Sequence, residues 1–279
     1  MRWLKAILSY EFARMRRKKS FYLLVLLALM PLIVGALIRV MGWEIEERED
    51  LWAVLLGANV YGAALTTPLS FLWIVGVLFG GDLYASEVED KSVGLLLSKP
   101  VSRAQIVAGK LLALTLLFAA YYVAATLLSM AGALLAGGGL AHAEYAPLIV
   151  AVSLASTLAF ALLAALLGAI SGKATSAILG AVATYMGLGI AVTIVSIAVI
   201  GNPQEAGGAF TKVMMLTPII SLADWPLATY AKFTGTGLLA TLANPDLINQ
   251  YYLPMSIEAI ATIAALFLAA KRVYETRDF

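Results

Sequence analysis

The chain has 279 residues, of which 62% are hydrophobic and only 13% are charged. Soluble domains usually contain about 45–50% apolar and about 25% charged residues, so this composition excludes an ordinary soluble enzyme and indicates a membrane protein with several spans. Because cysteine is absent, the chain has no disulfide and no thiolate metal site. A net charge of +2 gives no reason to expect nucleic acid as a partner.

The N-terminal residues 1–20 carry the pattern of an amphipathic helix that lies in the membrane interface. Apolar side chains recur at helical spacing, and cations fall elsewhere on the helix, where anionic headgroups would meet them. The residues assigned to this interfacial helix are Trp3, Leu4, Ile7, Leu8, Arg14, Arg16 and Arg17. The alternative is a basic tail that only marks the cytoplasmic side of the membrane.

The rest of the chain predicts an all-α, polytopic membrane fold with six transmembrane helices. A helix needs about 20 mainly apolar residues to cross the roughly 30 Å hydrocarbon core. The apolar runs that suit a span are residues 21–40, 55–80, 111–136, 147–171, 174–200 and 254–270. We therefore expect residues 1–279 to form a single transmembrane domain.

The distribution of Lys and Arg predicts that both termini are cytoplasmic. With the N-terminus inside, 15 of the 19 Lys and Arg residues fall on the cytoplasmic side of the six spans. Cytoplasmic loops of membrane proteins carry an excess of these residues. The one long external segment is then 201–253, which we expect to form short helices in the outer interface or a re-entrant pair.

Residues that could supply catalysis or energy are missing. His142 is the only histidine, so a histidine-based metalloprotease site is excluded, and no nucleophile and base stand at a recognisable spacing. Residues 168–174 resemble a phosphate loop, but three residues instead of four separate the glycines, and Ala174 replaces the Ser or Thr that holds magnesium. No ionisable residue lies near the middle of a predicted span, and Glu258 is expected one turn from the outer end of its helix. We expect no catalytic residue, metal or cofactor in this chain, and an energy source in another polypeptide.

The substantial cytoplasmic loop is residues 82–110, between the second and third predicted spans. Ser86 and Glu89 have the spacing of a capping box, which predicts a short helix that starts here and ends at Pro100. Ser102 can then cap a second helix that leads into the next span. Such an element could transmit motion from a bound subunit, or it could be a solvated connector. Local physics does not separate these two interpretations.

The loop also carries a motif that resembles the ABC-2 type permease family. Its residues are Glu87, Glu89, Gly94, Ser98, Pro100, Val101, Ser102 and Arg103, followed by Gly109 and Lys110. The wider layout is similar too, with a basic N-terminal helix, six spans, both ends inside and a long external segment before the last span.

The resemblance implies a transmembrane subunit of an ABC transporter, in most cases an exporter, in the plasma membrane of a prokaryote. Residues 87–97 correspond to the coupling helix, which docks on a separate ATPase subunit that binds ATP and magnesium. The implied coupling residues are Glu87, Glu89, Gly94, Pro100 and Arg103. Residues 4–18 correspond to the connecting helix, and the working unit pairs this chain with a second copy or a sister permease.

Two other functions remain open from the residues alone. A non-transporting membrane anchor or assembly subunit would also lack catalytic groups. An ion-coupled secondary carrier is disfavoured by the absence of ionisable residues at depth.

Overall fold

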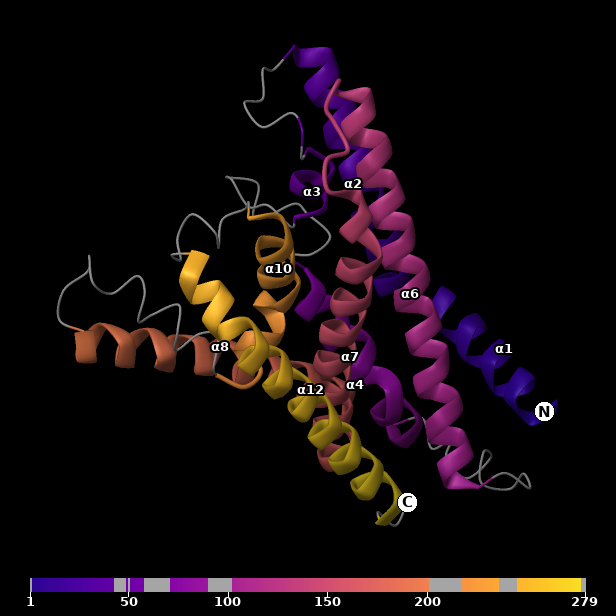
Figure 1. The fold of residues 1–279 in the computed structure, drawn as a ribbon. Helices are drawn as coiled ribbons and strands as arrows, with labels where there is room; N and C mark the ends of the chain where they lie inside the picture. Colours follow the sequence, from indigo (N-terminus) through magenta and orange to yellow (C-terminus); the bar gives the residue numbers. More distant parts are fainter. Residues whose placement is uncertain are drawn as a thin grey trace.

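The computed structural model describes residues 2–42, 49, 51–57, 71–89, 102–200, 217–235 and 245–276. Within these ranges the secondary structure is helical, without strands (Figure 1), so the predicted all-α class is confirmed for them. The elements are α1 (Arg2–Arg16), α2 (Lys19–Met41), α3 (Leu51–Leu56), α4 (Leu72–Glu89), α6 (Arg103–Leu135), the 3₁₀ turn η1 (Ala143–Tyr145), α7 (Ala146–Ser171), α8 (Ala174–Ile200), α10 (Ile220–Thr234) and α12 (Pro245–Thr276).

Long apolar helices make the chain a multi-pass membrane protein. In the described part of the chain, five helical stretches are long and apolar enough to cross a bilayer: Lys19–Met41, Gln105–Leu135, Ala143–Ser171, Ala174–Val192 and Ile248–Val273. They correspond to five of the six predicted spans. In the region of the second predicted span, residues 55–80, the apolar helix that the structure describes is the shorter stretch Trp73–Leu83 within α4. The count of six spans therefore stays a prediction.

Helices α4 and α7 pack with their backbones close together, and this contact forms much of the core. A side chain on Gly80 would collide with the backbone of Ala161 in α7, and one on Gly76 would meet the carbonyl oxygen of Thr157. Lipid tails are as apolar as leucine, so helices associate in a membrane through such close packing rather than through the hydrophobic effect. Gly76 and Gly80, four residues apart on one face of α4, allow this close approach.

Helices α2 and α6 start at the same end of the bundle and cross where both carry glycine. A side chain on Gly35 would collide with the backbone of Gly132, and one on Gly132 would collide with the carbonyl oxygen of Pro31. Pro31 lies inside α2 without ending it. The start of α1 and the end of α12 lie at the end of the bundle where α4 ends and α6 begins (Figure 1).

The predicted start of a helix at Ser86 is wrong. Helix α4 runs without a break from Leu72 to Glu89, so Ser86 lies within its last turns. The second predicted span is also wrong as one continuous helix, because α3 ends at Leu56 and Gly57 adopts a left-handed conformation. The predicted span ends at Gly80 because Asp82, a charged residue, follows shortly after it. Asp82 nevertheless lies inside α4, because Lys18 forms an ion pair with it.

The predicted start of the last helix at Pro254 is wrong as well. Helix α12 begins at Pro245 and continues through Pro254. Residues 245–253 therefore belong to the last helix rather than to a separate short helix before it. Glu258 consequently lies more than three turns into α12 instead of one turn from its end.

The predicted cap at Ser102 is confirmed. The hydroxyl of Ser102 accepts a hydrogen bond from the backbone N–H of Gln105, and the Gln105 side chain accepts one from the N–H of Ser102, which makes a capping box at the start of α6. Residues 168–171 are the last turn of α7, Gly172 ends that helix in the left-handed region, and α8 begins at Ala174, so the connection is only Gly172 and Lys173. Within the segment predicted to be external, α10 packs against α7 and α12 and buries Trp225 and Tyr230.

Candidate functional site: the junction of α1 with α4 and α6

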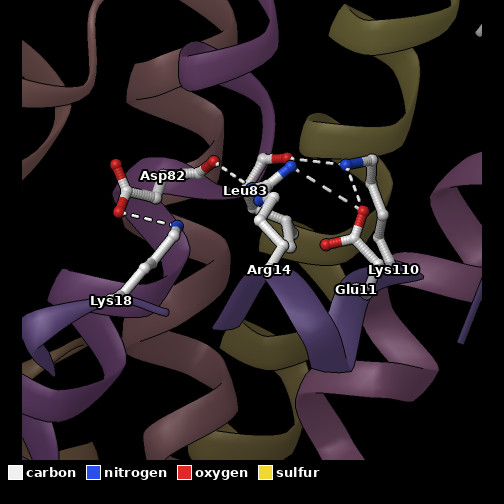
Figure 2. A network of polar contacts seen from close by, with 6 residues as sticks. All are labelled: Glu11, Arg14, Lys18, Asp82, Leu83 and Lys110. Atoms are coloured by element: carbon white, nitrogen blue, oxygen red, sulfur yellow. Dashed lines mark hydrogen bonds and ion pairs between the residues drawn. The ribbon is translucent and has the colours of Figure 1, made fainter. Parts of the chain in front are cut away.

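Charged side chains cluster where α1 meets α4 and α6 (Figure 2). We call this cluster the α1 junction. Its members are Glu11, Arg14, Lys18, Asp82, the carbonyl group of Leu83, and Lys110. The cluster brings together three segments that are far apart in the sequence.

A buried ion pair joins α1 to α6. The ammonium group of Lys110 lies 2.8 Å from Oε1 of Glu11, and the two side chains are only 1% and 2% exposed. Lys110 also donates a hydrogen bond of 3.2 Å to the carbonyl oxygen of Leu83 in α4. Buried charges persist in proteins when they are paired and hydrogen-bonded, so this pair fixes the position of α1 against α6.

A second set of contacts joins the end of α1 to α4. The ammonium group of Lys18 donates to Oδ2 of Asp82 at 2.8 Å, and the guanidinium group of Arg14 donates to the backbone oxygen of Asp82, also at 2.8 Å. Burial lowers the pKa of Lys18 from its ordinary value, and the hydrogen bond with Asp82 opposes that shift. Arg14 also lies 3.8 Å from Glu11, which links the two sets of contacts.

Apolar packing supports the same arrangement. Gly109 in α6 leaves room for Ile7, whose side chain would clash with a β-carbon at that position. Met15 is buried in the main core, and Leu8 packs against that core. One side of α1 therefore contacts the helix bundle, while Arg16 and Arg17 are exposed.

The α1 junction lies close to both ends of the predicted coupling segment. Asp82 precedes the end of α4 at Glu89 by seven residues, and Lys110 follows the start of α6 at Arg103 by seven residues. Each distance is about two helical turns. A force applied to residues 90–101 would therefore reach α1 through two helices that are both bonded to it.

The residues predicted for coupling are only partly described. Glu87 and Glu89 lie in the last turn of α4, and Arg103 is the first residue of α6, but their side chains are outside the described set. Gly94 and Pro100 lie outside the described residues altogether. Their role in coupling remains a prediction.

Six of the seven predicted interfacial residues lie on α1, as expected from their spacing, and Arg17 follows its last residue. Leu4, Ile7 and Leu8 are half-buried, and the side chain of Trp3 is outside the described set. Part of the apolar stripe thus contacts α6 rather than facing lipid. Whether the other face of α1 lies in the membrane interface stays a prediction.

Sequence reasoning missed the pairing of Glu11 with Lys110, although a signal for it exists. Glu11 shares the apolar stripe of α1, being four residues after Ile7 and four before Met15. Lys110 lies among buried residues of α6, three residues after Val107 and four before Leu114. Opposite charges on two apolar stripes indicate a buried ion pair between the two helices.

No catalytic or metal-binding arrangement occurs in the described ranges. They contain no group of three His, Cys, Asp or Glu side chains placed to hold a metal ion. His142 lies next to η1, with Nδ1 3.9 Å from a carboxylate oxygen of Glu144. This is an exposed ion pair in a connecting turn rather than a reaction centre.

Comparison with known proteins decides the family. A family model described as an ABC-2 family transporter protein matches residues 5–278, almost the whole chain. The chain belongs to the ABC-2 transporter family. No curated protein matches it significantly. Membership in this family implies a component of membrane transport, a membrane context and an ABC ATPase as partner.

Proposed function

We propose that this ABC-2 family protein is the transmembrane subunit of an ABC exporter in a prokaryotic plasma membrane. It forms the substrate path together with a second copy or a sister permease. A separate ATPase subunit binds ATP and magnesium and acts on this chain through the connection between α4 and α6.

The observation that carries the proposal is the position of the α1 junction. Helix α4 ends at Glu89, and α6 begins at Arg103 after its cap at Ser102. About two turns from these ends, each of the two helices is bonded to the α1 junction. A connection that only spans two helices does not need this support. A connection on which a partner subunit exerts force does need this support, because the force has to move the whole of α4 and α6 and not only the backbone of the connection.

Charge reversal in the last turn of α4 tests the proposal. We expect Glu87→Lys with Glu89→Lys to reduce co-purification of the ATPase subunit at least tenfold, because a partner surface that pairs with these carboxylates would then be repelled. The same variant should abolish the difference in ATP hydrolysis between the complex and the free ATPase subunit.

The control is Glu144→Lys, which reverses an exposed carboxylate near the opposite ends of α6 and α7. It should leave both co-purification and ATP hydrolysis unchanged. If the charge-reversal variant behaves like this control, coupling through residues 82–110 is wrong.

An ion-coupled carrier is a second candidate, and one observation favours it. Glu258 lies deeper in α12 than the sequence indicated, within the stretch Ile248–Val273 that is long and apolar enough to cross a bilayer. Ionisable groups at such depth often serve ion pathways. If the protein is an ion-coupled carrier, the reconstituted chain transports under an ion gradient without any ATPase subunit. If it is an ATPase-driven transporter, the same preparation shows no transport.

A further inference from the structure

An apolar groove lies between α2 and α6, separate from the charged contacts of the α1 junction. Its volume is about 270 Å³. Leu24, Ala28, Leu117 and Tyr121 form its floor and are nearly fully buried, while Val25 and Leu29 line it and remain substantially exposed. The groove is therefore open at the surface of the helix bundle.

The groove exists because α2 and α6 make their closest contact elsewhere. They touch at Gly35 and Gly132, and the groove occupies the turns between this crossing and the start of α2. Alanine lines it at Ala28, Ala120 and Ala124, where larger side chains would fill the space. On α2 it extends from Phe21 to Leu29, a length of about 12 Å at 1.5 Å per residue.

Cations lie just beyond one end of the groove. Arg17 and Lys19 are exposed and precede Phe21 by four and two residues. Lys18 lies between them but pairs with Asp82. Because a membrane-surface phosphate is attracted to Lys and Arg near the end of a span, this end of the groove suits an anionic headgroup.

We propose that the groove binds one acyl chain of an anionic phospholipid, with the phosphate at Arg17 and Lys19. The lining is apolar except for the hydroxyl of Tyr121, so a polar substrate or a peptide backbone would lose more hydrogen bonds with water than this one group could replace. The acyl chain and the phosphate match the two parts of the site, and both lie in the same membrane leaflet. The site does not depend on ATP coupling and stands if the proposed function fails.

Native mass spectrometry of the full chain in detergent tests this site. We expect the chain to retain phosphatidylglycerol at least tenfold more strongly than phosphatidylcholine with the same acyl chains. Ala124→Phe should reduce retention of both lipids, because the new ring occupies the groove. Arg17→Gln with Lys19→Gln should remove the preference for phosphatidylglycerol but not the binding of an acyl chain.

Two matched controls separate the groove from general lipid contact. Leu179→Phe enlarges a side chain that is 63% exposed on α8, and Lys173→Gln removes an exposed cation beyond α7. Neither should change lipid retention. Equal retention of the two lipids by the wild type, or unchanged retention in Ala124→Phe, overturns the proposal. If Ala124→Phe instead converts a dimer to a monomer with lipid retention unchanged, the occupant is a second copy of the chain and the proposal is also wrong.

Discussion

Replacing Lys110 by methionine is expected to lower the free energy of unfolding by about 3–5 kcal/mol, because buried Glu11 would lose its closest partner and keep only Arg14, 3.8 Å away. Both side chains are almost fully buried and lie 2.8 Å apart, so water cannot replace the lost ammonium group without opening the contact between α1 and α6. Methionine has a similar length and keeps the apolar part of the packing. The decrease in the free energy of unfolding therefore reports the missing ammonium group of Lys110 rather than a cavity.

The double variant Glu11→Leu with Lys110→Met separates pairing from packing. Replacing a buried ion pair by apolar side chains is often neutral or stabilising, so most of the lost stability should return. Lys173→Met, at an exposed position, is the control and should change stability by less than about 0.5 kcal/mol. The measurement is chemical unfolding in detergent micelles. If Lys110→Met resembles the control, the ion pair does not hold α1 in place.

Replacing Gly80 by leucine is the second change with a large expected effect. A side chain at Gly80 would collide with the backbone of Ala161, so α4 and α7 would have to separate. Overpacking of this kind usually costs about 1–3 kcal/mol, and a backbone contact that cannot repack should reach the upper end of that range. In a helix, leucine is otherwise favoured over glycine by up to about 1 kcal/mol, so a net loss has to come from the contact with α7.

The matched control for this change is Gly187→Leu in α8. Gly187 is exposed, and a side chain there would meet no atom within 4 Å. The control should be as stable as the wild type or more stable in thermal unfolding followed by size-exclusion chromatography. Equal stability of the two leucine variants would show that α4 and α7 are not in close backbone contact.

The sequence predicted most of the membrane helices because a bilayer imposes a length and a composition on them. Five of the predicted runs match helices of the described structure. Their ends were less predictable, since hydropathy falls at a charge or a proline whether or not the helix ends there. Asp82 stays helical because Lys18 neutralises it, and Pro254 stays helical inside α12.

The charged junction was not predicted, for a different reason. The motif of residues 87–103 indicates where a partner could act, but not what supports that segment. The partners Glu11 and Lys110 are separated by 99 positions, and although each lies on an apolar stripe, neither stripe specifies which helix holds the partner. Only the placement of α1 across α4 and α6 brings them together.

The most direct test of the central claim uses the absence of cysteine in the chain. A single Leu95→Cys substitution places a thiol in the proposed coupling segment, and its reaction with a membrane-impermeant maleimide is measured in oriented vesicles. We expect labelling from the cytoplasmic side alone, and at least tenfold slower labelling when the ATPase subunit is bound. Glu144→Cys, at the opposite end of α6 and α7, should react from the outside at the same rate with or without that subunit. Labelling of Leu95→Cys from the outside, or at a rate that the ATPase subunit does not change, would contradict the claim that this connection receives the force of ATP hydrolysis.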